Sequence, residues 1–223
     1  MKPKLVLATE NKSKRQEICD ILAQSIDNFD AFLSGSKLNG GSLIATVDEL
    51  RLKLPPEIGA TFEENALQKA QFVHQATGLP TLSDDSGLIV DVLVNAPGIL
   101  SARWSGVHGD DLANNQLLLS QLSSLPDSMM RAHFRAAVCL CYTLHGERKE
   151  VVEFGNMRGR ITRQMRGNNG FGYDTIFVPD DYDSTPLESK TTAELTAEQK
   201  NCISHRHKAL SKINPKLVQL FDD

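Results

Sequence analysis

Hydrophobic residues recur along the chain at spacings that predict a mixture of strands and helices. The apolar run at residues 4–9 is typical of a short buried strand. The helical pattern that follows it places three apolar residues on one face, namely Ile18, Ile21 and Leu22. A second helix is predicted from Thr61, which would cap it together with Glu64, to about Gly78.

The middle of the chain predicts strands. Residues 81–83 and 88–93 are predicted strands on either side of Asp84-Asp85-Ser86-Gly87, a sequence whose composition is typical of a tight turn. Apolar and polar positions then alternate over residues 132–144, as they do on a long strand with one buried face. Shorter strand patterns cover two further ranges, 151–154 and 175–178.

The remaining segments complete the predicted fold class. Residues 110–122 predict a helix capped by Asp110, and residues 196–220 predict an interrupted helix. Residues 34–55 have weak periodicity, and we interpret them as a β excursion or a long loop. Because strands and helices mix without strict alternation or repeats, we predict an α/β fold in a single domain over residues 1–223, with two lobes about one long sheet.

Composition excludes several classes of protein. The chain has 28 acidic and 24 basic residues, a net charge of −4, which disfavours a nucleic-acid binder. It contains no apolar run near the roughly 18–20 residues that span a bilayer, and no signal-peptide pattern follows Met1. The four cysteines have neither disulfide-framework nor zinc-site spacing. We therefore expect a cytoplasmic protein without a membrane or nucleic-acid partner.

One candidate phosphate site lies where the first strand meets the first helix, at Thr9-Glu10-Asn11-Lys12-Ser13-Lys14. Unpaired backbone N–H groups and the positive end of the helix dipole favour phosphate at such a point. Lys14 would add a mobile charge and Asn11 an amide donor. The alternative is an ordinary helix cap followed by solvated lysines.

A candidate metal site comes from three acids. The adjacent carboxylates of Asp84 and Asp85 repel each other unless a cation or a proton lies between them, and Mg²⁺ is bound by one or two carboxylates together with substrate phosphates. Glu57 precedes the second helix without a capping role, so it is a further candidate ligand, whereas Glu64 is explained by its cap. The alternative for the Asp84 sequence is an Asx-turn between strands.

A candidate base pocket combines a glycine-rich segment with a basic cluster. Glycines let the backbone approach a ligand and an aromatic face stacks on a nucleobase, which directs attention to Phe171-Gly172-Tyr173-Asp174. The basic cluster that follows consists of Lys200 and Ser204-His205-Arg206. The alternative for the glycine-rich segment is a plain turn before a strand, and the alternative for the basic cluster is a charged helix face. If Lys200 and His205 serve one ligand, the helix must break near residues 201–203, because positions five apart diverge by about 140° on one helix.

Taken in order, these segments resemble the inosine/xanthosine triphosphate pyrophosphatases over nearly the whole chain. The matching segments are Thr9-x-Asn11-x-x-Lys14, Glu57-x-Gly59-x-Thr61-Phe62-Glu63-Glu64-Asn65-Ala66, Asp84-Asp85-Ser86-Gly87, Ala96-Pro97-Gly98, Ser101-Ala102-Arg103-Trp104-Ser105-Gly106, Phe171-Gly172-Tyr173-Asp174, Lys190-Thr191-Thr192-Ala193-Glu194-Leu195, Lys200 and Ser204-His205-Arg206. Each is weak alone, and their common order carries the resemblance.

The resemblance implies an elongated, two-lobed α/β fold around a mixed sheet, with the nucleotide in the cleft between the lobes. It implies a Mg²⁺-dependent homodimer that cuts non-standard purine nucleoside triphosphates (ITP, dITP, XTP) into the monophosphate and pyrophosphate. Asp85 and Lys14 would be catalytic, and Glu57, Asp84 and Asp85 would contact the metal. The residues implied to bind substrate are Thr9, Glu10, Asn11, Lys12, Ser13, Lys14, Ser86, Phe171, Gly172, Tyr173, Asp174, Lys200, His205 and Arg206.

The chain departs from the family pattern in three places. Glu10 replaces a glycine, which puts a carboxylate beside the expected triphosphate and removes freedom for a positive φ. Thr175 replaces a common proline, and residues 34–55 are longer than usual. Glu10 favours one alternative, a nucleotide sensor without turnover; a pyrophosphatase for another modified nucleotide is a second, and a pure interaction module fits the motifs least.

Overall fold

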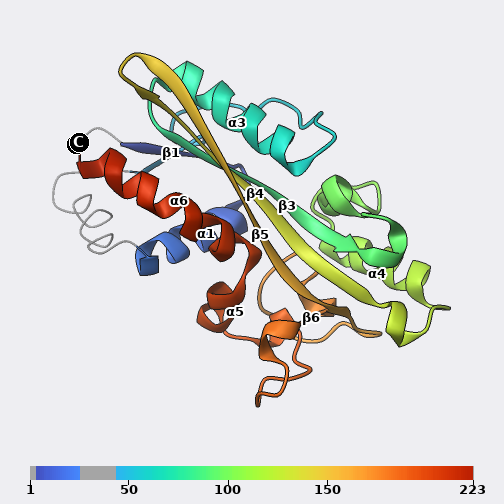
Figure 1. Ribbon diagram of the computed structural model, residues 1–223. Helices are drawn as coiled ribbons and strands as arrows, with labels where there is room; N and C mark the ends of the chain where they lie inside the picture. The colour runs from blue at the N-terminus through green and yellow to red at the C-terminus, as the bar shows by residue number, and fades with distance from the viewer. Residues whose placement is uncertain (1–3, 26–43, 223) are drawn as a thin grey trace. The chain divides into compact units, whose positions relative to one another are not determined.

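The structure, a computed structural model, describes residues 4–25 and 44–222. These residues form a mixed α/β fold with a six-stranded sheet in the order β2-β1-β3-β4-β5-β6 (Figure 1). The strands are β1 (Leu5–Ala8), β2 (Ile44–Thr46), β3 (Thr81–Val90), β4 (Arg131–Leu144), β5 (Glu147–Ile161) and β6 (Phe177–Pro179). Strand β1 runs parallel to β2 and β3, and β5 runs antiparallel to β6. The predicted α/β class and mixed sheet are confirmed.

In the described residues, the helices agree with the sequence signals at α3 and α4 most closely. They are α1 (Lys12–Ser25), α3 (Phe62–Thr77), α4 (Asp111–Leu122), α5 (Ala197–Ile203) and α6 (His205–Asp222). The Thr61 side chain caps α3, which ends at the left-handed Gly78, and Asp110 caps α4. The predicted break near residues 201–203 is confirmed, because Ser204 is extended between α5 and α6.

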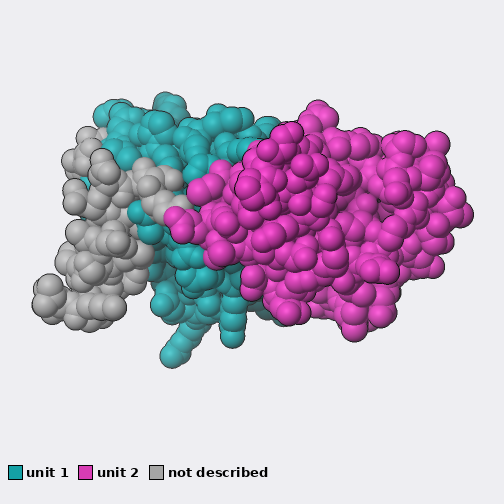
Figure 2. Space-filling view, turned by 90° about the horizontal axis from the view of Figure 1, so that it is seen from below, with its two compact units in different colours: residues 1–85, 137–155, 206–223 teal, residues 86–136, 156–205 magenta. Residues whose placement is uncertain are grey.

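The chain divides into two compact units (Figure 2). Unit 1 contains Met1–Asp85, Ala137–Gly155 and Arg206–Asp223, and unit 2 contains Ser86–Ala136 and Asn156–His205. Three of the boundaries fall inside β3, β4 and β5, so each of these long strands contributes residues to both units, and the fourth falls after the first residue of α6.

Unit 1 is organised around β1, whose four residues are all buried. Figure 1 shows α1 and α6 on one side of its strands and α3 on the other. A strand covered on both faces must be apolar throughout, which explains the continuous run in its sequence. Helix α3 buries the small residues Ala66 and Ala70 with Val73, as its periodicity predicts.

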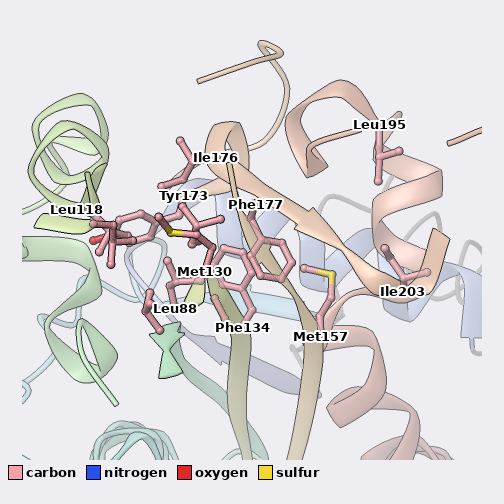
Figure 3. Close-up of a cluster of buried hydrophobic side chains, with 14 residues drawn as sticks. Leu88, Leu118, Met130, Phe134, Met157, Tyr173, Ile176, Phe177, Leu195 and Ile203 are labelled. Atoms are coloured by element: carbon pink, nitrogen blue, oxygen red, sulfur yellow. The ribbon is translucent and has the colours of Figure 1, made fainter. Parts of the chain in front are cut away.

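Unit 2 has its own hydrophobic core (Figure 3). Phe134 on β4 packs edge-on against Phe177 on β6, with ring centroids 4.8 Å apart. Leu118 of α4 and Tyr173 join the same cluster, so the loop before β6 is anchored in the core.

The predicted turn at residues 84–87 is wrong, because these residues lie inside the continuous strand β3. Partners elsewhere in unit 1 compensate the adjacent carboxylates of Asp84 and Asp85, so their charges do not interrupt the strand. Gly87 permits close packing rather than a turn. A Cβ atom there would overlap the Ser101 hydroxyl and the Gly98 carbonyl.

Other strand boundaries also differ from the prediction. The strand expected at 88–93 ends at Val90, and the one expected at 151–154 is part of the much longer β5. Residues 174–176 form a 3₁₀ turn before β6 rather than a strand. Of the segment 34–55, residues 44–46 form β2 as an added parallel strand, and residues 34–43 lie outside the described residues.

Val94 offers a test of backbone strain. It is exposed, β-branched and left-handed, with φ 50°. Since such a residue is strained there and glycine is not, Val94→Gly is expected to raise the free energy of unfolding by about 1 kcal/mol in urea denaturation. The control Val107→Gly, at an exposed position with ordinary φ, is expected to lower it. If both variants were destabilised equally, the hypothesis that the Val94 backbone is strained would be wrong.

Candidate active site

The candidate site of unit 1 is built on β3, where Asp84 and Asp85 are consecutive. Successive side chains of a strand point to opposite faces, so the two carboxylates meet different helices. Asp84 contacts Arg206 of α6, and Asp85 contacts Asn65 and Lys69 of α3, while α1 supplies one lysine to both. The Lys14 ammonium lies 3.7 Å from Asp84 and 3.9 Å from Asp85, so it serves both.

Asp84 is fully buried and is held by a buried arginine. Arg206 Nε donates to Asp84 Oδ2 at 2.9 Å, and Arg206 Nη1 donates to Glu17 Oε2 at 3.2 Å. Burial by itself would raise the pKa of the Asp84 carboxyl, but Arg206 and Lys14 hold that pKa well below its usual range. Asp84 is therefore ionised at neutral pH and ties β3 to α1 and α6.

Asp85 has a different environment. Its Oδ2 accepts a hydrogen bond from Asn65 Nδ2 at 2.9 Å, and Lys69 Nζ lies 3.9 Å from its Oδ1. Burial raises the pKa of the Asp85 carboxyl, with a further contribution from the negative charge of Glu57, against the lowering effect of Lys14 and Lys69. Two neighbouring carboxyls thus differ in proton affinity, as paired acids with different tasks do.

Lys69 lies between the carboxylates of Glu57 and Asp85. Its ammonium donates to Glu57 Oε1 at 2.5 Å and to the Asp84 carbonyl oxygen at 2.8 Å. Burial disfavours its charged form, yet Asp85 and Glu57 raise the pKa of Lys69 above its ordinary value. Burial lowers the pKa of Lys14 despite both aspartates. The cluster contains two cations with unequal proton affinities beside Asp85.

The segment from Thr9 to Lys14 is also part of unit 1. Asn11 Oδ1 accepts from the backbone N–H of Lys14 at 3.0 Å, and Thr9 Oγ1 accepts from that of Asn11 at 3.2 Å. Asn11 therefore caps α1, which is the structural role that the sequence left open. Lys12 and Ser13 are exposed on the first turn of this helix.

The predicted base-pocket residues mostly lie in unit 2, where Asp174 is the centre. The buried Asp174 Oδ2 accepts from Lys200 Nζ at 2.6 Å and from the Phe171 N–H at 2.8 Å. Thr192 Oγ1 donates to its other oxygen at 2.8 Å. Lys200 also lies 4.8 Å from the centre of the Phe171 ring, a cation–π contact. Ser86 is the first residue of this unit.

Side chains of α4 fix the Gly172 peptide. Asp111 Oδ2 accepts from its N–H at 2.6 Å, and Asn115 Nδ2 donates to its carbonyl oxygen at 2.8 Å. The segment has two aromatic side chains that could stack on a base, and Tyr173 is the buried one. Its hydroxyl donates a hydrogen bond to the Ser101 carbonyl. His205 is buried and stacks on Phe134 with ring centroids 5.0 Å apart.

Sequence reasoning missed three residues of the unit 1 cluster, Glu17, Asn65 and Lys69. Asn65 and Lys69 are four positions apart in α3, so they share a face. Both are polar and interleave with the apolar residues that the helix buries. Polar residues at i and i+4 inside a buried stripe are the signal that could have identified them. Glu17 has no comparable signal, since its partner Arg206 is distant in sequence.

The acids do not form a metal cage by themselves. Within residues 4–25 and 44–222, no group of three or more His, Cys, Asp and Glu side chains is placed to hold a metal ion. Asp84 pairs with Arg206, whereas Asp85 and Glu57 both lie within ion-pair distance of Lys69. One or two carboxylates suffice for Mg²⁺ when substrate phosphates supply further ligands.

The fold and this cluster define an α/β protein with carboxylates and lysines gathered at one strand. The model of the Ham1 family matches residues 5–216, so the chain belongs to the Ham1 family. It is 46% identical over 218 residues to a dITP/XTP pyrophosphatase of Streptomyces avermitilis, with 98% of each chain covered. It is 44% identical over 243 residues to that of Bifidobacterium animalis subsp. lactis, again with 98% of each covered.

Solved structures agree with this assignment. A HAM1 protein from Coxiella burnetii matches with a TM-score of 0.76 and 34% identity, covering 97% of this chain and 99% of that one. A nucleoside-triphosphatase, dITP/XTP pyrophosphatase, from Mycobacterium abscessus matches with a TM-score of 0.68 and 42% identity, covering 97% of this chain and 100% of that one.

Asp84→Asn tests the buried ion pair. Removing one partner of such a pair leaves an uncompensated charge, so the variant is expected to lose about 3 kcal/mol of stability at pH 7 in urea denaturation with EDTA. The folded pKa of Asp84 lies below the unfolded value of about 3.9, so its contribution is complete above that value and lost as the pH falls below it. The variant should therefore lose less stability on acidification than the wild type.

The exposed Asp127 provides the control for this comparison. It pairs with Arg163 at the surface, so Asp127→Asn is expected to change stability by less than about 1 kcal/mol. An Asp84→Asn protein that keeps the wild-type stability and acid dependence would show that the buried charge does not stabilise the fold.

Proposed function

We propose that this chain hydrolyses non-standard purine nucleoside triphosphates, ITP, dITP and XTP, to the monophosphate and pyrophosphate, and so cleanses the nucleotide pool. The observation that carries the proposal is the unit 1 cluster, in which Asp85 lies among Lys14, Lys69 and Glu57. The relatives in Bifidobacterium animalis and Streptomyces avermitilis are named dITP/XTP pyrophosphatases, which supports the substrate class.

The charges of the cluster suit an attack on a polyphosphate. Phosphoryl transfer depends on positioning and charge stabilisation more than on covalent chemistry. We assign Lys14 and Lys69 to the negative charge of the phosphates. Asp85, whose pKa is raised, is suited to accept a proton from the attacking water. The water oxygen bonds to the α-phosphorus, the bond from that phosphorus to the bridging oxygen breaks, and pyrophosphate leaves.

We include Mg²⁺ in the proposal. Asp85 and Glu57 are the residues that would hold it, because Glu57 adds negative charge beside Asp85. When bound, the ion would supply charge neutralisation to the phosphates and to the leaving pyrophosphate. The resemblance implies Asp84 as a third ligand, and we keep it in the proposal; in the structure its carboxylate pairs with Arg206 and lies near Lys14.

We assign base recognition to the predicted pocket residues. The Phe171 ring is the partly exposed aromatic of its segment and the best candidate for stacking. Hypoxanthine and xanthine present an acceptor at O6, which a donor from His205 would satisfy. Arg206, the other residue predicted for this role, belongs to unit 1 and is paired there with Asp84 and Glu17. Adenine presents a donor at that position and would leave the protein donor unpaired, which costs about 1–3 kcal/mol.

Asp85→Asn tests the proton acceptor. The variant is expected to fold, because Asn preserves size and an acceptor oxygen, yet to lose pyrophosphate release from ITP by at least about a thousandfold. Glu63→Gln is the control, and it is expected to keep wild-type turnover because Glu63 is exposed on the first turn of α3. Retained turnover in Asp85→Asn would remove Asp85 from the mechanism.

A panel of nucleoside triphosphates tests the substrate class. We expect turnover of ITP, dITP and XTP with Mg²⁺, much slower turnover of ATP and GTP, and loss of turnover in EDTA that added Mg²⁺ restores. Nucleotide binding without turnover would identify the sensor that Glu10 favours. Preference for a pyrimidine or another modified base would identify the second alternative.

Two further predictions concern a membrane and a second copy of the chain. In the part of the chain that the structure describes, no helix is both long and apolar enough to cross a membrane. Assembly as a homodimer stays a prediction from the resemblance.

A further inference from the structure

Glu10, the residue that replaces the family's glycine, has a defined contact in unit 1. Its Oε1 accepts a hydrogen bond from the backbone N–H of Leu54 at 3.1 Å. Glu10 is not among the described non-glycine residues with positive φ, so its backbone conformation is open to any amino acid. The replacement therefore costs no strain, and it ties two segments together that are distant in the sequence.

Residues 47–54, the strap, are fixed on unit 1 by other contacts as well. Leu50, Leu52 and Leu54 pack against the hydrophobic cluster that contains Val6 and Val73. Arg15 of α1 pairs with Asp48 at 3.2 Å near the start of the strap. The contact from Glu10 to Leu54 fixes its far end.

The chain between Leu54 and Glu57 transmits this constraint. It consists of Pro55 and Pro56, whose rings hold φ near −65° and restrict the residue before each of them. On the other side of Glu57, the Gly59 N–H donates to Asn65 Oδ1 at 2.8 Å. Glu57 therefore lies between two anchored backbone positions, with its carboxylate on Lys69.

We propose that Glu10 is a positioning residue, whose carboxylate holds the strap at Leu54 and thereby presents Glu57 to Lys69 and Asp85. The inference rests on the proposed function for the role of Glu57. It also reverses the expected effect of Glu10. Because the Glu10 carboxylate accepts the hydrogen bond from Leu54, it helps to position the site and is not expected to repel the triphosphate.

Amide hydrogen exchange tests the contact directly and does not depend on catalysis. In Glu10→Ala, the Leu54 amide is expected to exchange about tenfold faster than in the wild type, while Glu10→Gln, which keeps an acceptor oxygen, stays within about twofold. The Val6 amide, bonded to the Pro80 carbonyl at 2.9 Å, is the internal reference for global unfolding. Glu63→Gln is the charge-matched control.

Steady-state kinetics on ITP separates the two roles of Glu10. Positioning predicts that Glu10→Ala lowers kcat about tenfold and that Glu10→Gln and Glu63→Gln keep it. Repulsion predicts instead that Glu10→Ala and Glu10→Gln both lower KM and keep kcat, which would overturn the proposal.

Two results of the exchange experiment would also overturn the proposal. An unchanged Leu54 amide in Glu10→Ala would show that no tether exists, and equal loss of protection at Val6 would show a general structural role. If the wild type hydrolyses no triphosphate, the proposed function fails. The exchange of the Leu54 amide then decides by itself whether Glu10 holds the strap.

Discussion

The unit 1 site depends on compensating two adjacent carboxylates inside a buried strand. Neither Asp84 nor Asp85 could remain ionised there without cations, since the desolvation of a charge costs several kcal/mol. Arg206, Lys14 and Lys69 provide that compensation from three helices. The same charges that stabilise the strand are those that a polyphosphate would meet, so stability and the proposed function share one electrostatic arrangement.

Strand geometry divides the work between the two acids. Asp84 faces the side of Arg206 and becomes a structural anion, held by a low pKa. Asp85 faces the side of α3, where burial and Glu57 raise its pKa. The two aspartates are consecutive in β3, yet Asp84 organises the site as a buried anion and Asp85 is suited to accept a proton. In unit 2, Asp174 has the organising role, since it holds Lys200, Thr192 and the Phe171 backbone.

Glu10 shows how a departure from a family pattern is resolved by its surroundings. A carboxylate near a phosphate site suggests lost affinity when it is considered in sequence alone. The strap brings a backbone N–H to it, and the stiff Pro55-Pro56 link extends the effect of that contact to Glu57. The negative charge of Glu10 therefore does not by itself predict repulsion of the triphosphate, because the role of the carboxylate depends on its hydrogen-bond partner.

Local sequence signals were sufficient to predict the features that depend on neighbouring residues. Period and caps located α3 and α4, because these signals act over a few residues. A break near residues 201–203 followed from the hypothesis that Lys200 and His205 serve one ligand, and the structure has its extended residue at Ser204. The tertiary structure decided what depends on distant partners: residues 84–87 became strand because Arg206 and the lysines compensate their charges. Lys69 and Glu17 entered the site for the same reason, since ion pairs join residues whose separation no local pattern records.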